Sequence, residues 1–216
     1  ALMLYYALFQ DRISKAGFSS INEALELIHN PKYACFKQEI SEIVSYLLAN
    51  LNIKTVPLGP NIIPGLELYG CYTREDIFTL VGRQTADKKM QGAASGVFNL
   101  PEHNATLLFV TLNKSEKDFS PSTQYNDYII NENYFHWQSQ NTDSHDNKGG
   151  HRYTKQSKRN NKIILFVREE KKDGFGNTSP FHCFGQVQYV SSHDDYPMNV
   201  IWKLHKPAMP QYLRAI

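Results

Sequence analysis

The spacing of apolar residues changes along this chain, and that change sets the fold class. Up to about residue 50, apolar side chains recur every three or four positions, as they do in amphipathic helices. After Gly92 they gather in short dense runs such as TLLFVTL at 106–112, which are typical of strands. Helices that precede a set of strands favour an α+β fold over a sheet with alternating helices.

Three helices are expected in the N-terminal region. Their apolar positions are Leu2, Tyr5, Tyr6 and Phe9, then Ile21, Ala24, Leu25 and Ile28, then Phe36, Ile40, Ile43, Val44, Leu47 and Leu48. The pattern Ser20 to Glu23 predicts a capping box at the start of the second helix. A stretch rich in Pro and Gly at 53–64 indicates a linker, and a further short helix is expected within 72–82. We therefore assign residues 1–66 to a helical coupler region and 67–216 to a second domain.

The second domain is expected to be a sheet. Strands are predicted at 106–112, 133–140, 162–168, 182–190 and 198–204. Polar or Gly/Pro loops separate these strands. Several strands with one or two short helices suggest a twisted, mixed and partly closed barrel.

Composition narrows the functional classes. The chain has 41% hydrophobic and 20% charged residues, as expected for a soluble globular protein, and no apolar run approaches a membrane span. Its three cysteines, Cys35, Cys71 and Cys183, form no CxxC pair, so we expect neither a zinc site nor a disulfide framework, and a reducing cytoplasm is the natural location. The chain starts without Met inside an apparent helix, which indicates a fragment of a larger protein.

The net charge of +2 is too small to indicate a nucleic-acid binder by itself. Basic charge is concentrated instead in the irregular segment 144–162, whose part from Lys148 onward holds six Lys or Arg and no acid, with Gly149–Gly150 as an expected hinge. A phosphate clamp is one interpretation of this loop, because Lys and Arg gain affinity from counterion release. A solvated loop is the other, and charge runs usually are solvated loops.

Aromatic and hydrogen-bonding side chains are mixed in the stretch 119–140. Its aromatic residues include Tyr125, Tyr128, Tyr134, Phe135 and Trp137. A ring to stack on and a polar edge to read are what a nucleobase needs, but an aromatic core with satisfied polar tips has the same composition. In the run 135–140, odd and even residues alternate between two faces of a strand.

Asp127 is the main candidate for reading a base edge. In an extended chain its carboxylate shares a face with Tyr125 and could accept a hydrogen bond from the exocyclic amine of cytosine, whereas thymine offers an acceptor there. An Asp that accepts backbone N–H bonds in a turn is the ordinary alternative. Catalytic candidates are Asp143, His145 and His151, or His193, Asp194 and Asp195, but neither set has a recognised metal-ligand spacing.

Several motifs together resemble a known family. They are YTRED at 72–76, LLFVTLNKSEKDFSPSTQYNDYIINENYFHWQSQNT at 107–142, GHRY at 150–153, ILFVRE at 164–169 and PMNVIWKL at 197–204. They look like the C-terminal domain of unknown function that follows DEAD/DEAH-type helicase cores, and they are similar to SauUSI-type, modification-dependent (type IV) restriction endonucleases. The helical region before them resembles the coupler between helicase and target-recognition domain.

The resemblance implies a target-recognition domain of SRA-like (PUA-like) fold that flips 5-methylcytosine, or its hydroxymethyl form, out of duplex DNA. The fragment itself would be no enzyme and would hold no cofactor or metal, while the parent chain would use ATP and a divalent metal with helicase and phospholipase-D-like nuclease domains. The modified-base pocket is predicted to use Tyr125, Asp127, Tyr128, Phe135, Trp137, Gln138 and Ser139. Contacts to the DNA backbone are predicted for Lys114, Ser115, Arg152, Tyr153, Lys155, Lys158 and Arg159.

Two functions from other classes remain open. One is a protein-interaction domain that regulates the helicase without reading DNA. The other is a nuclease that uses His and Asp with a metal.

Overall fold

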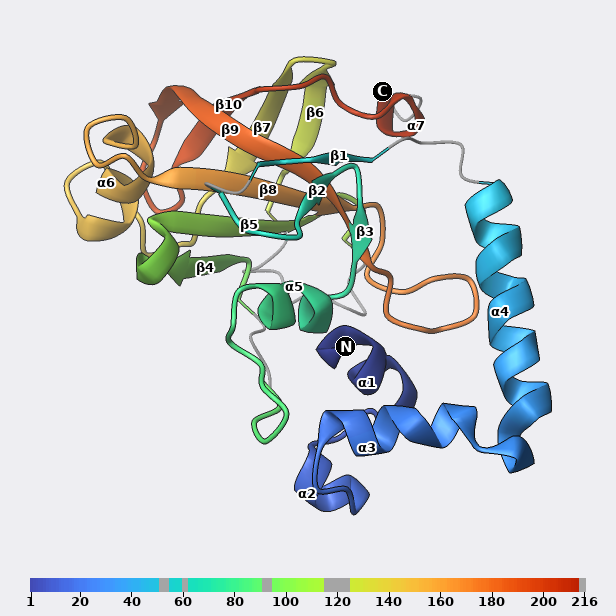
Figure 1. The fold of residues 1–216 in the computed structure, drawn as a ribbon. Helices are drawn as coiled ribbons and strands as arrows, with labels where there is room; N and C mark the ends of the chain where they lie inside the picture. The colour runs from blue at the N-terminus through green and yellow to red at the C-terminus, as the bar shows by residue number, and fades with distance from the viewer. Residues whose placement is uncertain (51–54, 60–61, 91–94, 115–124, 214–216) are drawn as a thin grey trace. The chain divides into compact units, whose positions relative to one another are not determined.

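The computed structural model describes residues 1–50, 55–59, 62–90, 95–114 and 125–213 (Figure 1). They form two compact units, the first from Ala1–Lys54 and Arg74–Gly92 and the second from Thr55–Thr73 and Ala93–Ile216. The division differs from the predicted boundary at residue 66, because the chain returns to the first unit for residues 74–92. No helix in the described ranges has the length and apolar character needed to span a membrane.

The first unit is helical. Its helices are α1 (Leu2–Phe9), α2 (Ile13–Ala16), α3 (Ile21–Glu26), α4 (Ala34–Ala49) and α5 (Arg74–Leu80), with short 3-10 turns η1 (Leu27–His29) and η2 (Pro31–Tyr33). Tyr5, Tyr6, Ile13 and Ala24 form a small core. The predicted cap at Ser20 is confirmed, since its hydroxyl accepts from the Glu23 N–H at 3.1 Å.

Helix α4 confirms the third predicted helix, and its apolar face is exposed. None of its 16 residues is buried. The stripe predicted from helical spacing includes Ile43, Val44, Leu47 and Leu48, whose exposed fractions lie between 48% and 64%. The periodicity thus identified the helix, while tertiary packing leaves its apolar side open to solvent.

The second unit is built on an eight-stranded mixed sheet, which confirms the α+β class. Its strands are β3 (Cys71–Tyr72), β4 (Val97–Leu100), β5 (Ala105–Thr111), β6 (Tyr128–Asn131), β7 (Tyr134–Gln138), β8 (Lys162–Arg168), β9 (Phe181–His193) and β10 (Asn199–Leu204). They follow the order β4-β5-β8-β9-β10-β7-β6, and β3 pairs with β9. A separate two-stranded sheet joins β1 (Val56–Pro57) to β2 (Glu67–Leu68).

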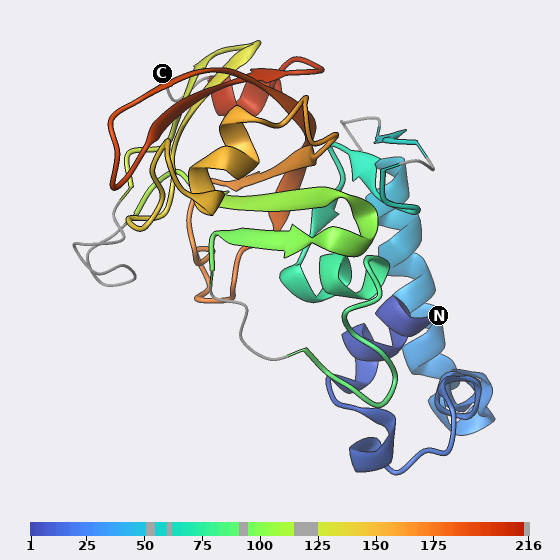
Figure 2. The same ribbon diagram turned by 90° about the vertical axis from the view of Figure 1, so that its left-hand side faces the viewer.

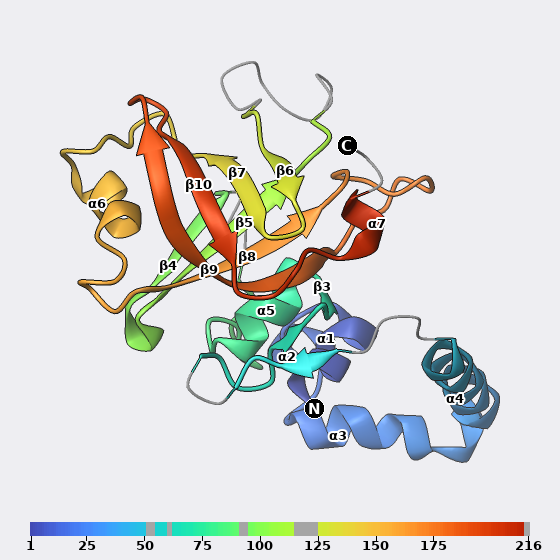
Figure 3. The same ribbon diagram turned by 90° about the horizontal axis from the view of Figure 1, so that it is seen from above.

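The sheet is not closed into a barrel. In the described ranges β4 and β6 stand at the two ends of the strand order and do not pair with each other. Figure 3 shows the β6, β7 and β10 end turned steeply away from β4 and β5. The structure therefore has an open, strongly twisted sheet in place of the predicted partly closed barrel. The two faces of β7 in this sheet have different surroundings.

The most deeply buried part of the sheet is the parallel pair β5 and β8, and Figure 2 shows β5 beside β4 as broad green ribbons. Every residue of β5 is buried, and so are six of the seven residues of β8. Near-continuous apolar runs are what a strand covered on both faces requires. Next to β8, strand β9 contains a bulge at Gly185, whose φ of 78° suits glycine.

Part of the basic segment after residue 144 is not the irregular loop that was predicted. Residues Lys148–Thr154 form helix α6, and the Asn147 side chain caps it by accepting from the Gly150 N–H at 3.0 Å. Gly149 and Gly150 serve close packing rather than a hinge. A Cβ on Gly149 would lie 1.8 Å from an Asp143 carboxylate oxygen, and one on Gly150 would lie 1.9 Å from the Ser144 carbonyl oxygen.

Candidate nucleic-acid interface

One face of β7 belongs to the hydrophobic core. Phe135 is fully buried and Trp137 is 4% exposed. The Trp137 ring packs edge-on against Tyr153 of α6 at 5.0 Å between centroids and lies 6.1 Å from Trp202 of β10. We call this side of β7 and β10 the core face, defined by Phe135, Trp137, Val200 and Trp202. The structure thus corrects the prediction that Phe135 or Trp137 stacks on a base, because neither ring is open to solvent.

The opposite side of the same strands is polar. We call it the polar face and define it by Tyr128, His136, Gln138 and Asn199. Tyr128 of β6 is 44% exposed and stacks on His136, with 4.5 Å between ring centroids and 14° between planes. The His136 Nδ1 atom lies 2.8 Å from the Asn126 carbonyl oxygen, which can only accept, so Nδ1 is the protonated nitrogen. Tyr128 is therefore an exposed ring held flat by a fixed imidazole.

Asp127 lies beneath the polar face, and both oxygens of its carboxylate accept hydrogen bonds from other groups of the protein. Its Oδ2 accepts from Lys114 Nζ at 2.8 Å, and its Oδ1 accepts from the Gln138 backbone N–H at 2.8 Å. The two side chains of the pair are 4% and 8% exposed. Burial raises the pKa of Asp127 above its ordinary value, against the opposing effects of Lys114 and the Gln138 hydrogen bond. The carboxylate supports β7, which is the ordinary role that the sequence left open for it.

The ammonium group of Lys114 is likewise paired within the second unit. Its ammonium also donates to the Tyr125 carbonyl oxygen at 2.7 Å. A buried, paired lysine has no charge to offer a phosphate, so the predicted backbone contact by Lys114 is corrected. Tyr125 is half-buried, and Ser115 lies outside the described residues.

The amides of Gln138 and Asn199 form a directed row across β7 and β10. The Asn126 N–H donates to Gln138 Oε1 at 2.6 Å, and Gln138 Nε2 donates to Asn199 Oδ1 at 3.0 Å. Asn199 Nδ2 then donates to an Asp194 carboxylate oxygen at 3.0 Å. A backbone N–H at one end and a carboxylate at the other fix the orientation of both amides.

Ser139 is a structural residue. It is fully buried, its hydroxyl accepts from the Met198 N–H at 3.0 Å and it donates to the Gln140 carbonyl oxygen at 3.1 Å. The bond with Met198 joins the end of β7 to the start of β10. Because Ser139 is buried and both bonds are made within the protein, its hydroxyl is not open to a base edge, which corrects its predicted place in the pocket. Sequence analysis did not identify Asn199 as a site residue. Its position one residue before Val200 in a strand, on the opposite face from Val200 and Trp202, could have placed it on the polar face.

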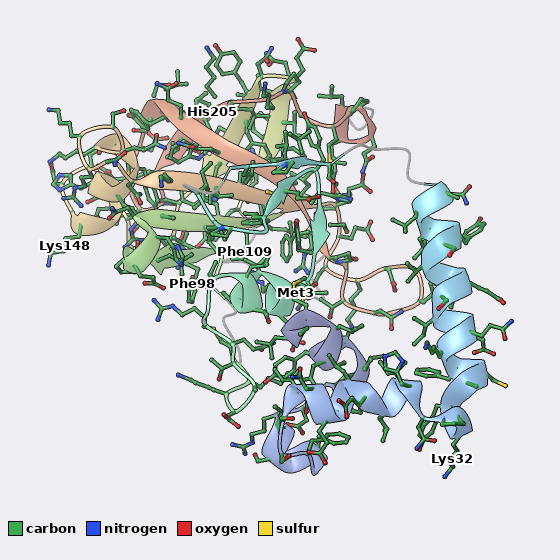
Figure 4. All side chains as sticks on the ribbon, in the orientation of Figure 1. Met3, Lys32, Phe98, Phe109, Lys148 and His205 are labelled. Atoms are coloured by element: carbon green, nitrogen blue, oxygen red, sulfur yellow. The ribbon has the colours of Figure 1, made fainter. Side chains whose placement is uncertain are left out.

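The basic charge of this unit gathers on and after α6. Lys148, Lys155, Lys158 and Arg159 are exposed and Arg152 is half-buried. Figure 4 shows Lys148 projecting outward from the helix. Tyr153, predicted to contact DNA, is instead fully buried, and its hydroxyl donates to Asp143 at 3.1 Å. The helix therefore attaches to the core by one face and carries cations on the other.

One member of each set of catalytic candidates, His145 and Asp195, takes part in a row of hydrogen bonds. His145 Nδ1 and the His145 N–H lie 2.8 and 2.7 Å from Asp195 Oδ1, and His145 Nε2 lies 2.7 Å from the Ser192 hydroxyl. The order resembles a Ser-His-Asp triad, but the His145 and Asp195 side chains are 37% and 41% exposed. A catalytic triad works in a water-excluded site with oxyanion donors. We therefore interpret these hydrogen bonds as structural, because they connect the segment before α6 to the turn between β9 and β10.

A hollow of 590 Å³ lies at the turn between β6 and β7. It is lined by Ile130, Asn131, Glu132, Asn133, Tyr134 and Leu213. Tyr134 shares the orientation of His136 and Gln138 along β7, so the hollow adjoins the polar face at its other end. Of the predicted pocket residues, none lines it.

These features define a class of protein with an α+β fold. It has a helical unit and an open, twisted sheet, one face of which is polar and bears an exposed aromatic ring. The chain belongs to the DUF3427 family, described as a domain of unknown function, whose family model matches residues 66–215. No curated protein matches the chain at a significant level.

Proposed function

We propose that the second unit binds duplex DNA that contains 5-methylcytosine or 5-hydroxymethylcytosine and takes the modified base out of the stack. It would act as the target-recognition part of an ATP-dependent, modification-dependent restriction endonuclease, and its fold would be of the SRA-like kind. The helicase and phospholipase-D-like nuclease domains of that parent chain would supply the catalysis in the cytoplasm. The observation that carries the proposal is the exposed Tyr128 ring on a rigid strand face beside two oriented amides.

Tyr128 is the ring best suited to a base. Stacking on an aromatic side chain stabilises a bound base by about 1–3 kcal/mol. Tyr128 has one side against His136 and is 44% exposed, so its ring needs little ordering when a base arrives. Gln138 follows His136 on the same face of β7, and Asn199 lies across from Gln138 on β10, which places hydrogen-bonding groups on the same face as the stacking surface.

The cations that follow α6 suit the phosphates. Taking a base out of the duplex costs a few kcal/mol, which backbone contacts must offset. Lys155, Lys158 and Arg159 are exposed and lie within five residues of each other, and no acid falls between them. The discrimination by the methyl group is finite, because one methyl in an apolar recess is worth roughly 1–3 kcal/mol, or about 10–200-fold.

The test is a fluorescence-anisotropy titration of this chain with matched duplexes that carry cytosine, 5-methylcytosine or 5-hydroxymethylcytosine at one position. We expect tighter binding to a modified duplex, and a loss of about 5- to 100-fold of that binding in Tyr128→Ala. Tyr46→Ala is the matched control, since Tyr46 is a 68% exposed tyrosine of α4 in the other unit. Equal affinity of the unaltered chain for all three duplexes would refute the proposed function.

The same titration, repeated at several salt concentrations, tests the basic segment that follows α6. Replacing Lys155, Lys158 and Arg159 with Ala should weaken modified and plain duplexes alike and reduce the salt slope by about 2–3. Replacing Lys32, Lys37 and Lys88, which are exposed lysines of the helical unit, removes the same charge elsewhere and should change the slope little. A loss of selectivity, rather than of general affinity, would contradict the phosphate role.

A second candidate function is a protein contact made by the helical unit. It is favoured by α4, whose exposed Ile43, Val44 and Leu47 form one apolar side. The partner we propose is the helicase domain of the parent chain. Leu47→Lys should then lower methylation-stimulated ATP hydrolysis by the parent enzyme while DNA binding by the second unit stays unchanged.

A further inference from the structure

The polar face contains a pair of hydrogen-bond donors whose direction the structure sets. We infer that Gln138 and Asn199 together read two adjacent acceptors on the base, the ring nitrogen N3 and the carbonyl oxygen O2 of cytosine, and that the amine of cytosine is not read by Asp127. This inference rests on the proposed function and adds the chemistry of selection to it.

The orientation of the two amides follows from their partners. A backbone N–H can only donate, so the atom of Gln138 that faces Asn126 at 2.6 Å is the oxygen. Its nitrogen therefore faces Asn199, and the nitrogen of Asn199 faces the carboxylate of Asp194 at 3.0 Å. Reversing either amide would set oxygen against oxygen, or nitrogen against an N–H, within this row.

Each amide nitrogen keeps one further N–H. Each carries two hydrogens and uses one within the row. Among the described residues neither nitrogen has a second partner, and both side chains are half-buried rather than enclosed. The register pairs Gln138 directly with Asn199, so the two spare donors are neighbours across β7 and β10, about 5 Å apart at the backbone.

Two neighbouring donors select the ligand by its pattern of acceptors. Cytosine and its 5-substituted forms present N3 and O2 side by side as acceptors. Thymine carries a proton on N3, so its donors and acceptors alternate and one spare N–H would be left facing an N–H. Asp127 cannot add an acceptor for the amine, because both its oxygens are bonded to the protein and it is 4% exposed.

The inference can be tested with base analogues that change one atom group. In the matched duplexes, the 5-methylcytosine is replaced either by its 3-deaza form, which has C–H in place of N3, or by 5-methyl-2-pyrimidinone, which lacks the amine but keeps N3 and O2. Both analogues weaken pairing with guanine, but not equally, so the melting temperatures of the two duplexes give the correction for easier extrusion. We expect the 3-deaza duplex to bind about tenfold more weakly than the pyrimidinone duplex, as for one lost hydrogen bond.

A thermodynamic cycle assigns the effect to the protein. The two variants are Asn199→Ala and Gln138→Ala. At least one of them should bind the two analogue duplexes with equal affinity, because it lacks the N–H donor that bonds to N3. Circular dichroism and urea denaturation in the absence of DNA identify any variant that fails to fold. The comparison of the two analogue duplexes on the unaltered chain does not depend on these variants.

The outcomes separate the two proposals. If the unaltered chain does not prefer methylated over plain duplex, the proposed function fails. If that preference holds but the pyrimidinone duplex binds as weakly as, or more weakly than, the 3-deaza duplex, the amine is what the protein reads and the donor-pair inference is overturned. A ratio near tenfold in the expected direction supports it.

Discussion

The two faces of the β6–β7–β10 region have the same alternating sequence pattern and opposite fates. On the core face, Trp137 and Trp202 are at most 4% exposed and pack with Tyr153. On the polar face, Tyr128 remains 44% exposed over His136. Both faces hold aromatic rings, so aromatic content does not distinguish a core from a binding surface. What distinguishes them is the helix α6, which covers one side only.

The comparison also shows how each face is held in place. The core face depends on shape, with ring centroids 5.0 to 6.2 Å apart at steep or tilted angles. The polar face depends on directed hydrogen bonds that begin at the buried pair Lys114–Asp127 and continue through Gln138 to Asn199. Removing a ring should therefore cost stability on one face and binding on the other.

The largest expected effect is on the core face. Trp202→Ala should lower the free energy of unfolding by about 3–5 kcal/mol, because it removes a fully buried ring that touches Trp137, Tyr153 and Tyr189. Tyr128→Ala should change the same quantity by no more than about 0.5 kcal/mol. Urea denaturation followed by circular dichroism measures both. Similar losses in the two variants would end the distinction between the faces.

The buried pair beneath the polar face comes next. Asp127→Ala leaves Lys114 buried without its countercharge and should cost about 3 kcal/mol, part of which returns when Lys114→Met is added. Asp127→Asn keeps an acceptor for the Gln138 N–H, so a protein that still folds should retain its preference for methylated duplex. If Asp127→Asn folds normally and loses that preference, the carboxylate reads the base after all.

The sequence predicted much of the sheet because its strands are short, dense apolar runs. The predicted strand at 162–168 matches β8, and that at 106–112 differs from β5 by one residue at each end. The alternation of residues 135–140 was also predicted correctly. What alternation cannot specify is which face another element will cover, and here α6 decides that through Tyr153.

The basic segment and the acids show the same limit for the candidate site. A run with two glycines and many cations favours a loop, yet close contact of Gly149 with Asp143 allows a helix to dock there. Asp127 had the right chemistry for cytosine, but Lys114 lies 13 positions away in sequence, and only the fold brings the pair to 2.8 Å. Long-range partners of polar residues are the part of a site that one sequence leaves open.

The smallest expected effect concerns the acid that holds α6 against the core face. Asp143 accepts from the Tyr153 hydroxyl at 3.1 Å, and burial raises the pKa of Asp143 above its ordinary value, opposed by this bond and by Arg152. The folded state therefore binds this proton more tightly than the unfolded state, whose pKa is about 3.9. The contribution of Asp143 to stability is greatest below that value and is lost as the pH rises through the folded-state pKa.

Asp143→Asn keeps an acceptor for Tyr153 and removes the titration. Relative to this variant, the unaltered chain should lose unfolding free energy as the pH rises above about 4, while the raised pKa of Asp127 acts equally in both proteins and cancels. Urea denaturation from pH 4 to pH 7 gives the two curves. Parallel curves would mean that Asp143 is as well solvated as in the unfolded chain, and α6 would then be held to the core face by the Tyr153 ring and the close glycine contacts alone.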